Sequence, residues 1–209
     1  MIPAGTDEFW QARIGKVTAS RIADVTARIK NGWGASRANY MAELIAERLT
    51  GTQTEGYTNA AMQWGIDHEA EARTAYEFYT DATVGLGGFL IHPTIPASGA
   101  SPDGFVESAG LVEIKCPNTA THIDTLLALS IPEKYVKQMQ WQMACSGTLW
   151  CDFVSYDPRM PENMRLFVRR IERNAGLIAS LEKDVIEFLT EMDERIAALQ
   201  RHYGMKVAA

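Results

Sequence analysis

Apolar side chains recur every three or four residues along several stretches of the chain, which is the spacing of one face of an α-helix. The longest such stripe occupies 174–203, where acidic residues lie between the apolar positions. Ser36 is placed to cap one helix and Gly51 to end it, and Pro132 and Gly147 bracket another helix in a similar way. The pattern predicts helices over 6–13, from 18–20 onward, and over 36–49, 59–79, 132–145 and 174–203.

Five shorter stretches are rich in Val, Leu, Ile and Phe and are punctuated by glycine, which is typical of β-strands. Strands are predicted over 83–92, 97–106, 111–116, 149–156 and 166–171. The order of helices, strands, helix, strands and a final helix predicts an α/β (α+β) fold, with a central mixed β-sheet flanked by helices. No repeat or long linker interrupts the sequence, so we expect one domain over 1–209.

The composition bears on the compartment. Hydrophobic residues make up 46% of the chain and charged residues 22%, as in an ordinary globular protein. The three cysteines are odd in number and form no Cys-x-x-Cys pair, so we expect them to be reduced. The N-terminal stretch has no signal-peptide pattern, and the sequence has no apolar run long enough for a membrane span. We therefore expect a cytoplasmic protein without membrane contact.

The charge is unevenly distributed along the chain. The net charge of −6 argues against a protein that coats nucleic acid non-specifically. The segment 13–37 nevertheless holds six basic residues and one acid, so it carries +5 and the rest of the chain −11. Two interpretations remain open for this basic run: a face that holds a polyanion, or a solvated helix face.

A polar cluster lies among the predicted strands. Glu113 and Lys115 are separated by one residue on a strand, so their side chains point to the same face of the sheet. Asp103 precedes them across a predicted turn at 107–110. If the loop holds three residues, Asp103 lies opposite or diagonal to the Glu113–Lys115 pair. Two carboxylates and an ammonium group then converge on one patch.

This patch has the chemistry of a site for a hard divalent cation. Mg²⁺ prefers oxygen ligands and takes one or two carboxylates together with several waters. A bound metal would neutralise charge on a phosphoryl oxygen, and Lys115 would orient the attacking water, or deprotonate it if neighbours lower the lysine pKa. The alternative is a chance polar face on a half-exposed hairpin. Pro102 before Asp103 favours the metal site, because the stretch matches the PD-(D/E)xK pattern of metal-dependent nucleases.

Five motifs carry a resemblance to a known family. The first has the form Arg-x-Gly-x-x-Thr-Ala-Ser, and the central one combines Ser-Pro-Asp-Gly with Glu-Ile-Lys-Cys-Pro. The motifs occupy 13–20, 61–73, 101–117, 135–140 and 156–159. In this order they resemble the phage lambda exonuclease-like alkaline nucleases, the YqaJ-type viral recombinases of the PD-(D/E)xK superfamily. The resemblance covers most of the chain and implies a restriction-endonuclease-like core.

The resemblance implies a role for each matching residue of the metal centre. Asp103 and Glu113 would ligate Mg²⁺, with Mn²⁺ as a possible substitute, helped by the backbone carbonyl of Ile114. Lys115 would position the attacking water. Gln138 would support that water or the scissile phosphate.

The family's pocket for a 5′ phosphate corresponds to Arg13, Ser20 and Ser101. A guanidinium group offers two parallel donors to a phosphate and hydroxyls add more, although Ser20 alone can also be a helix cap. Met62 matches the apolar wedge that separates the bases at the duplex end, and its alternative is a core methionine. Glu69 would be a further acid near the metal, and its alternative is a surface carboxylate on a helix.

The function implied by the resemblance is that of a Mg²⁺-dependent, processive 5′→3′ exonuclease on double-stranded DNA, which releases 5′-mononucleotides and leaves 3′ overhangs for phage-type recombination. The implied partners are DNA ends with a 5′ phosphate, two further copies in a toroidal homotrimer with the basic run in its channel, and a single-strand annealing protein of the same phage or prophage. Lys30 aligns loosely, and 31–34 departs from the family pattern. Two rival functions stay open: an endonuclease with the same metal site, and a non-catalytic DNA-end-binding module.

Overall fold

The fold is that of a computed structural model, which describes residues 1–54 and 60–204. Its main sheet has five strands in the order β11-β10-β9-β8-β5. β9 and β10 run parallel and the other neighbours antiparallel, so the sheet is mixed, as predicted. The strands are β5 (Val84–Leu86), β8 (Gly104–Val106), β9 (Gly110–Lys115), β10 (Trp150–Tyr156) and β11 (Leu166–Glu172).

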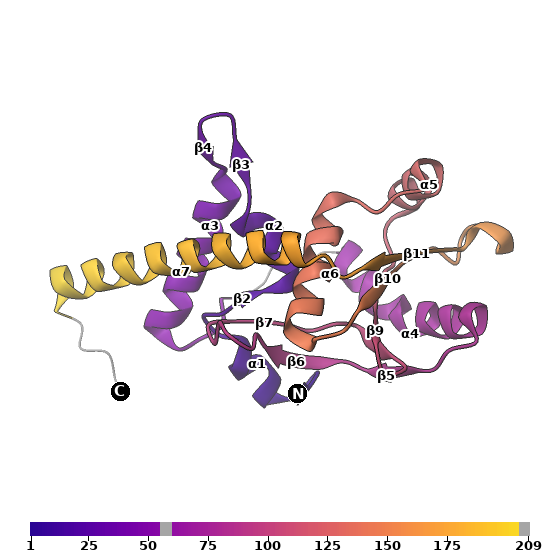
Figure 1. Cartoon of the computed structure of the whole chain (residues 1–209), viewed down its shortest axis with the longest axis horizontal. Helices are drawn as coiled ribbons and strands as arrows, with labels where there is room; N and C mark the ends of the chain where they lie inside the picture. The colour runs from indigo at the N-terminus through magenta and orange to yellow at the C-terminus, as the bar shows by residue number, and fades with distance from the viewer. Residues whose placement is uncertain (55–59, 205–209) are drawn as a thin grey trace.

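Helices pack on both faces of this sheet, which confirms the predicted architecture (Figure 1). Val112 and Ile114 of β9 pack in one cluster with side chains of α4 (Ala60–Thr80). Leu111 points to the opposite face and packs with side chains of α6 (Glu133–Ser146). Because successive strand residues alternate between faces, the acid and the lysine of the predicted site share the α6 face with Leu111.

A second, four-stranded sheet explains why two predicted strands are wrong in extent. The predicted strands 83–92 and 97–106 each divide between the two sheets, one at Gly87 and the other around Pro102. A Cβ on Gly87 would lie 1.8 Å from the Pro102 carbonyl oxygen, so the two breaks pack directly against each other. The strands of this sheet, in spatial order, are β1 (Ile2–Pro3), β6 (Gly88–Ile91), β7 (Ser98–Ala100) and β2 (Val17–Thr18).

One helix, α5 (Thr119–Ala128), was not predicted from the sequence. Its buried side chains are those of His122 and Thr125, whereas Leu127 is 78% exposed, so no apolar stripe marks the segment. Asn118 caps it by accepting a hydrogen bond from the Thr121 N–H.

The other helices are α1 (Asp7–Arg13), α2 (Ile22–Val25), α3 (Ala35–Thr50) and α7 (Ala175–Tyr203). The chain also forms the 3-10 turns η1 (Ala19–Arg21) and η2 (Glu162–Met164) and a hairpin of β3 (Arg28–Ile29) and β4 (Gly32–Trp33).

The predicted helix ends differ from the observed ones by a residue or two. Gly34 takes the N-cap position of α3 without a side-chain hydrogen bond, so Ser36 lies inside the first turn and the predicted serine cap is wrong. Pro132 is the N-cap of α6 and not its first residue. Gly51 ends α3 in the left-handed conformation, as predicted. The predicted start of α4 at 59 lies outside the described residues.

The long helix α7 runs alongside α2 and α3 (Figure 1). Val185, Phe188 and Met192 on one side of α7 are fully buried in the cluster that joins these helices, so the predicted amphipathic helix is confirmed. Within 1–54 and 60–204, no helix is both long enough and apolar enough to cross a membrane.

Candidate active site

The β8–β9 hairpin brings the predicted metal ligands together. The strands are joined by three residues, 107–109, and the observed register continues to place Asp103 opposite Glu113. Oδ2 of Asp103 accepts a hydrogen bond of 2.7 Å from the backbone N–H of Ile114. The predicted convergence of Asp103 with the Glu113–Lys115 pair is therefore confirmed.

Glu113 is fully buried, and its carboxylate is held from two sides. Oε1 accepts a hydrogen bond of 2.6 Å from Nε2 of Gln138 and forms an ion pair with the Lys115 ammonium group. Oε2 accepts a hydrogen bond of 2.5 Å from Nε2 of Gln142. The sequence interpretation missed Gln142. Its spacing from Gln138 is the signal that could have found it, because residues four apart lie on the same face of a helix.

The surroundings of Asp103 disfavour the charged form of its carboxyl group. Burial and the neighbouring Glu113 carboxylate raise the pKa of Asp103 well above its usual range. The Lys115 ammonium and the Ile114 N–H act in the opposite direction but do not cancel the rise. We call the side chains of Asp103, Glu113 and Lys115 the metal end of the site; it holds two carboxyl groups and one ammonium group.

Lys115 is held in its protonated form. Burial acts to lower the pKa of its ammonium group, but the Glu113 and Asp103 carboxylates outweigh that effect and raise the pKa above its usual value. A lysine that keeps its proton can orient a water through its N–H groups but does not deprotonate it. Both lysine roles that the sequence left open stay predictions, because a cation bound by Asp103 and Glu113 would weaken the effect of these carboxylates on Lys115.

The donor set suits Mg²⁺. Within the described ranges, no three His, Cys, Asp or Glu side chains are grouped so that they alone could hold a metal. The site would instead combine the Asp103 and Glu113 carboxylates with the Ile114 carbonyl, and waters would complete the shell. Mg²⁺ usually binds proteins through one or two carboxylates and keeps several waters. The repulsion between the Asp103 and Glu113 carboxylates, which adds to the effect of burial on the Asp103 pKa, is a second observation that fits a divalent cation.

Glu69 lies at the edge of the metal end. It is on α4 and lines a cavity of about 570 Å³ together with Asp103, Ile114 and Lys115. Its negative charge contributes to the raised pKa of Asp103. Oε1 of Glu69 accepts a hydrogen bond of 2.7 Å from Arg73, so the helix also holds this carboxylate in place. The structure therefore brings Glu69 to the site, as the resemblance implied.

Arg13 stands at the other end of the site without an acidic partner. Nη1 donates a hydrogen bond of 2.7 Å to Oγ of Ser101, and the guanidinium lies 5.1 Å and 5.5 Å from the ring centres of Phe9 and Phe89. Burial lowers the pKa of Arg13, although Tyr40 and Glu47 act in the opposite direction. No carboxylate of the described residues forms an ion pair with this guanidinium, which leaves its charge available to an anion.

A single cavity connects the two ends. It has a volume of about 250 Å³. Its lining includes the predicted phosphate-binding residues and most of the predicted metal centre, namely Arg13, Ser20, Ser101, Asp103, Glu113, Lys115 and Gln138. Ser20 is exposed in η1, and neither η1 nor α2 has a side-chain N-cap, so Ser20 is not the helix cap that was its alternative.

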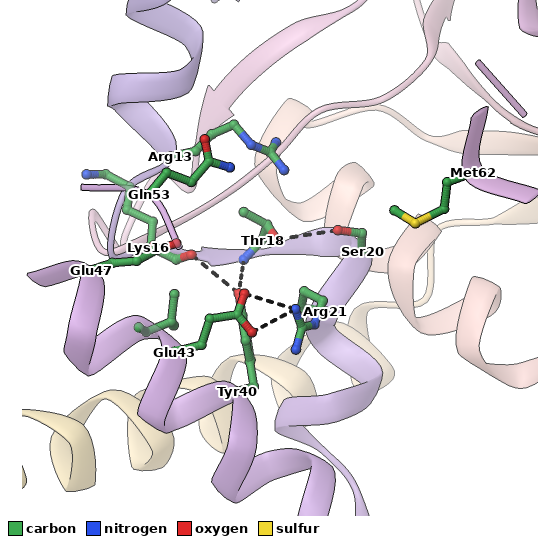
Figure 2. A pocket seen from close by; sticks show the side chains of 11 residues that line it. Arg13, Lys16, Thr18, Ser20, Arg21, Tyr40, Glu43, Glu47, Gln53 and Met62 are labelled. Carbon is green, nitrogen blue, oxygen red and sulfur yellow. Dashed lines mark hydrogen bonds and ion pairs between the residues drawn. The ribbon is translucent and has the colours of Figure 1, made fainter. Parts of the chain in front are cut away.

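Met62 borders the site and is not a core residue. Its side chain is 53% exposed. It lines both the 570 Å³ cavity and a further pocket of about 270 Å³ beside Arg13 and Ser20. Figure 2 shows its sulfur on the side of this pocket nearest Ser20, with Arg13 above and Tyr40 below. The alternative of a core methionine is therefore wrong, and the wedge role stays a prediction.

Three of the six basic residues of the run at 13–37 form ion pairs with described residues. Arg21 pairs with Asp24 and Glu43, and Arg28 pairs with Asp184. Arg37 is buried against Glu191. Lys16 and Lys30 form no ion pair with residues in the described part of the chain. The run therefore presents less unpaired positive charge than the sequence count suggested, because acids distant in sequence fold onto part of it.

Comparisons with known proteins agree with this geometry. Residues 8–149 match the YqaJ-like viral recombinase domain. The chain belongs to this family. This chain is also 35% identical over 75 residues to a curated protein, the putative uncharacterized protein ExoD of Escherichia coli (strain K12). That alignment covers 36% of this chain and 85% of ExoD.

This YqaJ-family chain is similar to solved structures over nearly its whole length. It is 53% identical to LHK-Exo, an alkaline exonuclease from Laribacter hongkongensis, with a TM-score of 0.88 over 95% of this chain and 98% of that one. For LHK-Exo in complex with dAMP, the identity is 52% and the TM-score 0.90 at the same coverage. A phage-related exonuclease from Haemophilus somnus 129PT shares the fold, with a TM-score of 0.73 at 17% identity over 88% of this chain and 96% of that one. The predicted family and fold class are confirmed.

Proposed function

We propose that this YqaJ-family chain is a Mg²⁺-dependent 5′→3′ exonuclease that degrades double-stranded DNA, releases 5′-mononucleotides and leaves 3′ overhangs. One observation carries the proposal. The 250 Å³ cavity places the Arg13 guanidinium, which forms no ion pair with a described residue, and the carboxylates of Asp103 and Glu113 at the ends of the same space. A DNA end that fills this space meets an anion-binding group and a cation-binding group together.

The residues of the phosphate end would fix the position of the strand. The Arg13 guanidinium and the hydroxyls of Ser20 and Ser101 offer donors to a terminal 5′ phosphate. Holding that phosphate brings the next phosphodiester of the strand towards Asp103 and Glu113. The same contacts would favour ends that carry a 5′ phosphate over those that carry a hydroxyl.

The residues of the metal end would carry out hydrolysis. Asp103, Glu113 and the Ile114 carbonyl would hold Mg²⁺, and Mn²⁺ is a possible substitute because it also suits oxygen ligands. When bound, the metal supplies Lewis acidity and neutralises charge on the phosphodiester. Lys115 orients the attacking water through its N–H groups, and Gln138 keeps the Glu113 carboxylate in place. Cleavage next to the held phosphate releases one nucleotide, and dAMP bound to LHK-Exo supports a site for such a product.

Processivity, assembly and partners belong to the same proposal. A toroidal homotrimer would keep the enzyme on its DNA, and a single-strand annealing protein of the same phage or prophage would take up the 3′ overhang. Membership of the viral recombinase family supports the recombination role. Light scattering coupled to size-exclusion chromatography tests the assembly, because a monomer at working concentration would contradict the ring.

The decisive test uses blunt linear duplex with either 5′-phosphate or 5′-hydroxyl ends, in Mg²⁺ or in chelator, with Asp103→Ala as the comparison. We expect mononucleotide release only for the wild type in Mg²⁺, and faster release from 5′-phosphate ends. Covalently closed circular DNA is included because an exonuclease leaves it intact and an endonuclease does not. Undiminished digestion by Asp103→Ala would overturn the metal assignment, and equal rates on both kinds of end would overturn the phosphate pocket.

A further inference from the structure

Gln142 contacts the predicted metal ligand from the side opposite the cavity. Its Nε2 donates a hydrogen bond of 2.5 Å to Oε2 of Glu113. The side chain is fully buried, and it does not line the 250 Å³ cavity, whereas Gln138, one helical turn earlier on α6, does. A DNA substrate in this cavity would therefore meet Gln138 but not Gln142.

The other end of the Gln142 amide is unsatisfied. Its Oε1 is buried and accepts no hydrogen bond from any described residue. A buried carbonyl oxygen without a donor is unfavourable, because it has lost its water and gained nothing in return. Two neighbouring positions of α6, Met139 and Met143, are buried methionines. An apolar side chain would suit the core at least as well, so packing alone does not explain the amide.

The two oxygens of the Glu113 carboxylate have different surroundings. Oε1 meets Gln138 and Lys115, which both line the cavity. Oε2 meets Gln142, on the closed side. The terminal torsion of a glutamate is soft, with no sharp staggered minima. A donor behind the carboxylate holds the second oxygen and so fixes the plane of the group, with Oε1 turned towards the cavity.

We propose that Gln142 is a positioning residue, which holds the Glu113 carboxylate so that Oε1 faces the cavity and thereby sets the affinity of the site for Mg²⁺. The inference rests on the proposed function, because it requires Glu113 to bind a cation. Partners that orient a metal ligand from outside the first shell typically change metal affinity by about 10- to 100-fold when they are removed.

The test compares Gln142→Met with Gln140→Met. Gln140 is a matched control because it is a buried amide on the same helix, but its hydrogen bonds of 2.8 Å join the Glu172 carbonyl and the Asn174 N–H, away from the site. Two readouts are needed: the Mg²⁺ concentration at half-maximal nuclease rate, and the Mn²⁺ dissociation constant from calorimetry without DNA. We expect Gln142→Met to raise both by about 10- to 100-fold. Gln140→Met should lower the melting temperature and leave both constants unchanged.

Unchanged metal constants in Gln142→Met would overturn the inference, as would an equal rise in both variants. If Gln142→Met does not fold, Gln142→Leu gives the same comparison, because it also removes the donor and the unpaired carbonyl. Asp103→Ala distinguishes a failure of the proposed function from a failure of the role of Gln142. A fully active Asp103→Ala would overturn the proposed function, whereas an inactive Asp103→Ala beside an unaffected Gln142→Met would overturn only the role of Gln142.

Discussion

The two ends of the active-site cavity are held in opposite ways. At the metal end, the carboxylates of Asp103 and Glu113 receive hydrogen bonds from a backbone N–H and from buried glutamine amides, and one ammonium group lies beside them. At the phosphate end, Arg13 donates a hydrogen bond to Ser101 and has no ion-pair partner among the described residues. The metal end presents carboxylates that a bound cation would neutralise, and the phosphate end presents one guanidinium that a bound anion would neutralise.

Under the proposed function, this difference separates hydrolysis at the metal end from the choice of DNA end at the phosphate end. Every substrate must react at the metal end, so a change there should slow hydrolysis of all ends alike. Only a substrate with a 5′ phosphate uses the full phosphate end, so a change there should depend on the end group. The predictions below test that separation, beginning with the largest expected effect.

Removing a carboxylate at the metal end should give the largest loss. Asp103→Asn keeps the shape of the side chain but takes away one charge of the metal site. We expect the nuclease rate to fall by about 10³-fold, on the scale of losing one preorganised electrostatic contact, with 5′-phosphate and 5′-hydroxyl ends affected equally. The measurement is nucleotide release from both substrates at saturating Mg²⁺.

A matched substitution of another buried carboxylate, that of Asp152, shows whether the rate loss is specific to the metal end. Asp152 on β10 is buried in the same sheet, but it is bound by Arg170 and Tyr76 and does not line the cavities described above. Asp152→Asn should destabilise the fold and leave the rate of the folded enzyme near that of the wild type. A rate loss in Asp152→Asn as large as in Asp103→Asn would show that both act through the sheet and not through a metal site.

Removing the charge at the phosphate end should give a smaller and selective loss. Arg13→Met keeps an apolar chain against Phe9 and Phe89 but removes the guanidinium. A hydrogen bond to a charged group contributes about 1.5–3 kcal/mol, so we expect a loss of about 10- to 100-fold on 5′-phosphate ends and little change on 5′-hydroxyl ends. Lys16→Met is the control, because Lys16 lines the neighbouring 270 Å³ pocket but not the cavity with the carboxylates. A uniform loss on both ends would contradict the separation.

The raised pKa of Asp103, caused first by its burial, also predicts how stability depends on pH. The folded-state pKa of Asp103 lies above its unfolded value, so the unfolded chain gives up this proton first as the pH rises. The contribution of Asp103 to stability is therefore present below the unfolded pKa and is lost as the pH rises through the folded one. In chelator, Asp103→Asn should melt a few degrees above the wild type at alkaline pH, and this advantage should shrink at acid pH.

Added Mg²⁺ should make the wild type melt at a higher temperature than Asp103→Asn. The wild type gains stability by binding the metal, whereas Asp103→Asn has lost a ligand and gains less. Thermal unfolding across a pH series, with and without Mg²⁺, measures both effects. A wild-type melting temperature that does not respond to Mg²⁺ would contradict the cation-binding role of this end.

The metal end was largely predictable from the sequence, and the phosphate end was not. Asp103, Glu113 and Lys115 lie within one hairpin, so the two-residue period of strands and a three-residue loop suffice to bring them together. Arg13 and Ser101 are 88 positions apart, and no local rule joins them. Their pairing, like the roles of Ser20 and Met62, came from the family resemblance and not from periodicity.

The fold shows the same limit. The mixed sheet and its flanking helices follow from hydrophobic patterning, but the division of two strands depends on Gly87 meeting the Pro102 carbonyl, a contact between distant segments. α5 buries His122, which lies between Ser155 and the Met164 carbonyl, so a hydrophobic pattern cannot find it. The ion pairs of Arg28 and Arg37 with α7 are equally invisible along the chain, and they account for the overestimated basic face.

Met62→Ala should give the smallest rate loss, because the side chain is neither part of the metal end nor a donor to the 5′ phosphate. The side chain lies between the two ends and is half exposed, so Met62→Ala should leave the melting temperature unchanged. Opening a terminal base pair costs a few kcal/mol, and an apolar contact offsets only part of that cost, so we expect a rate loss below about tenfold on fully paired ends. Duplexes with mismatched terminal pairs have already opened, so on these the variant and the wild type should react equally. An equal rate loss on paired and mismatched ends would show that Met62 acts on hydrolysis at the metal end and not on strand separation.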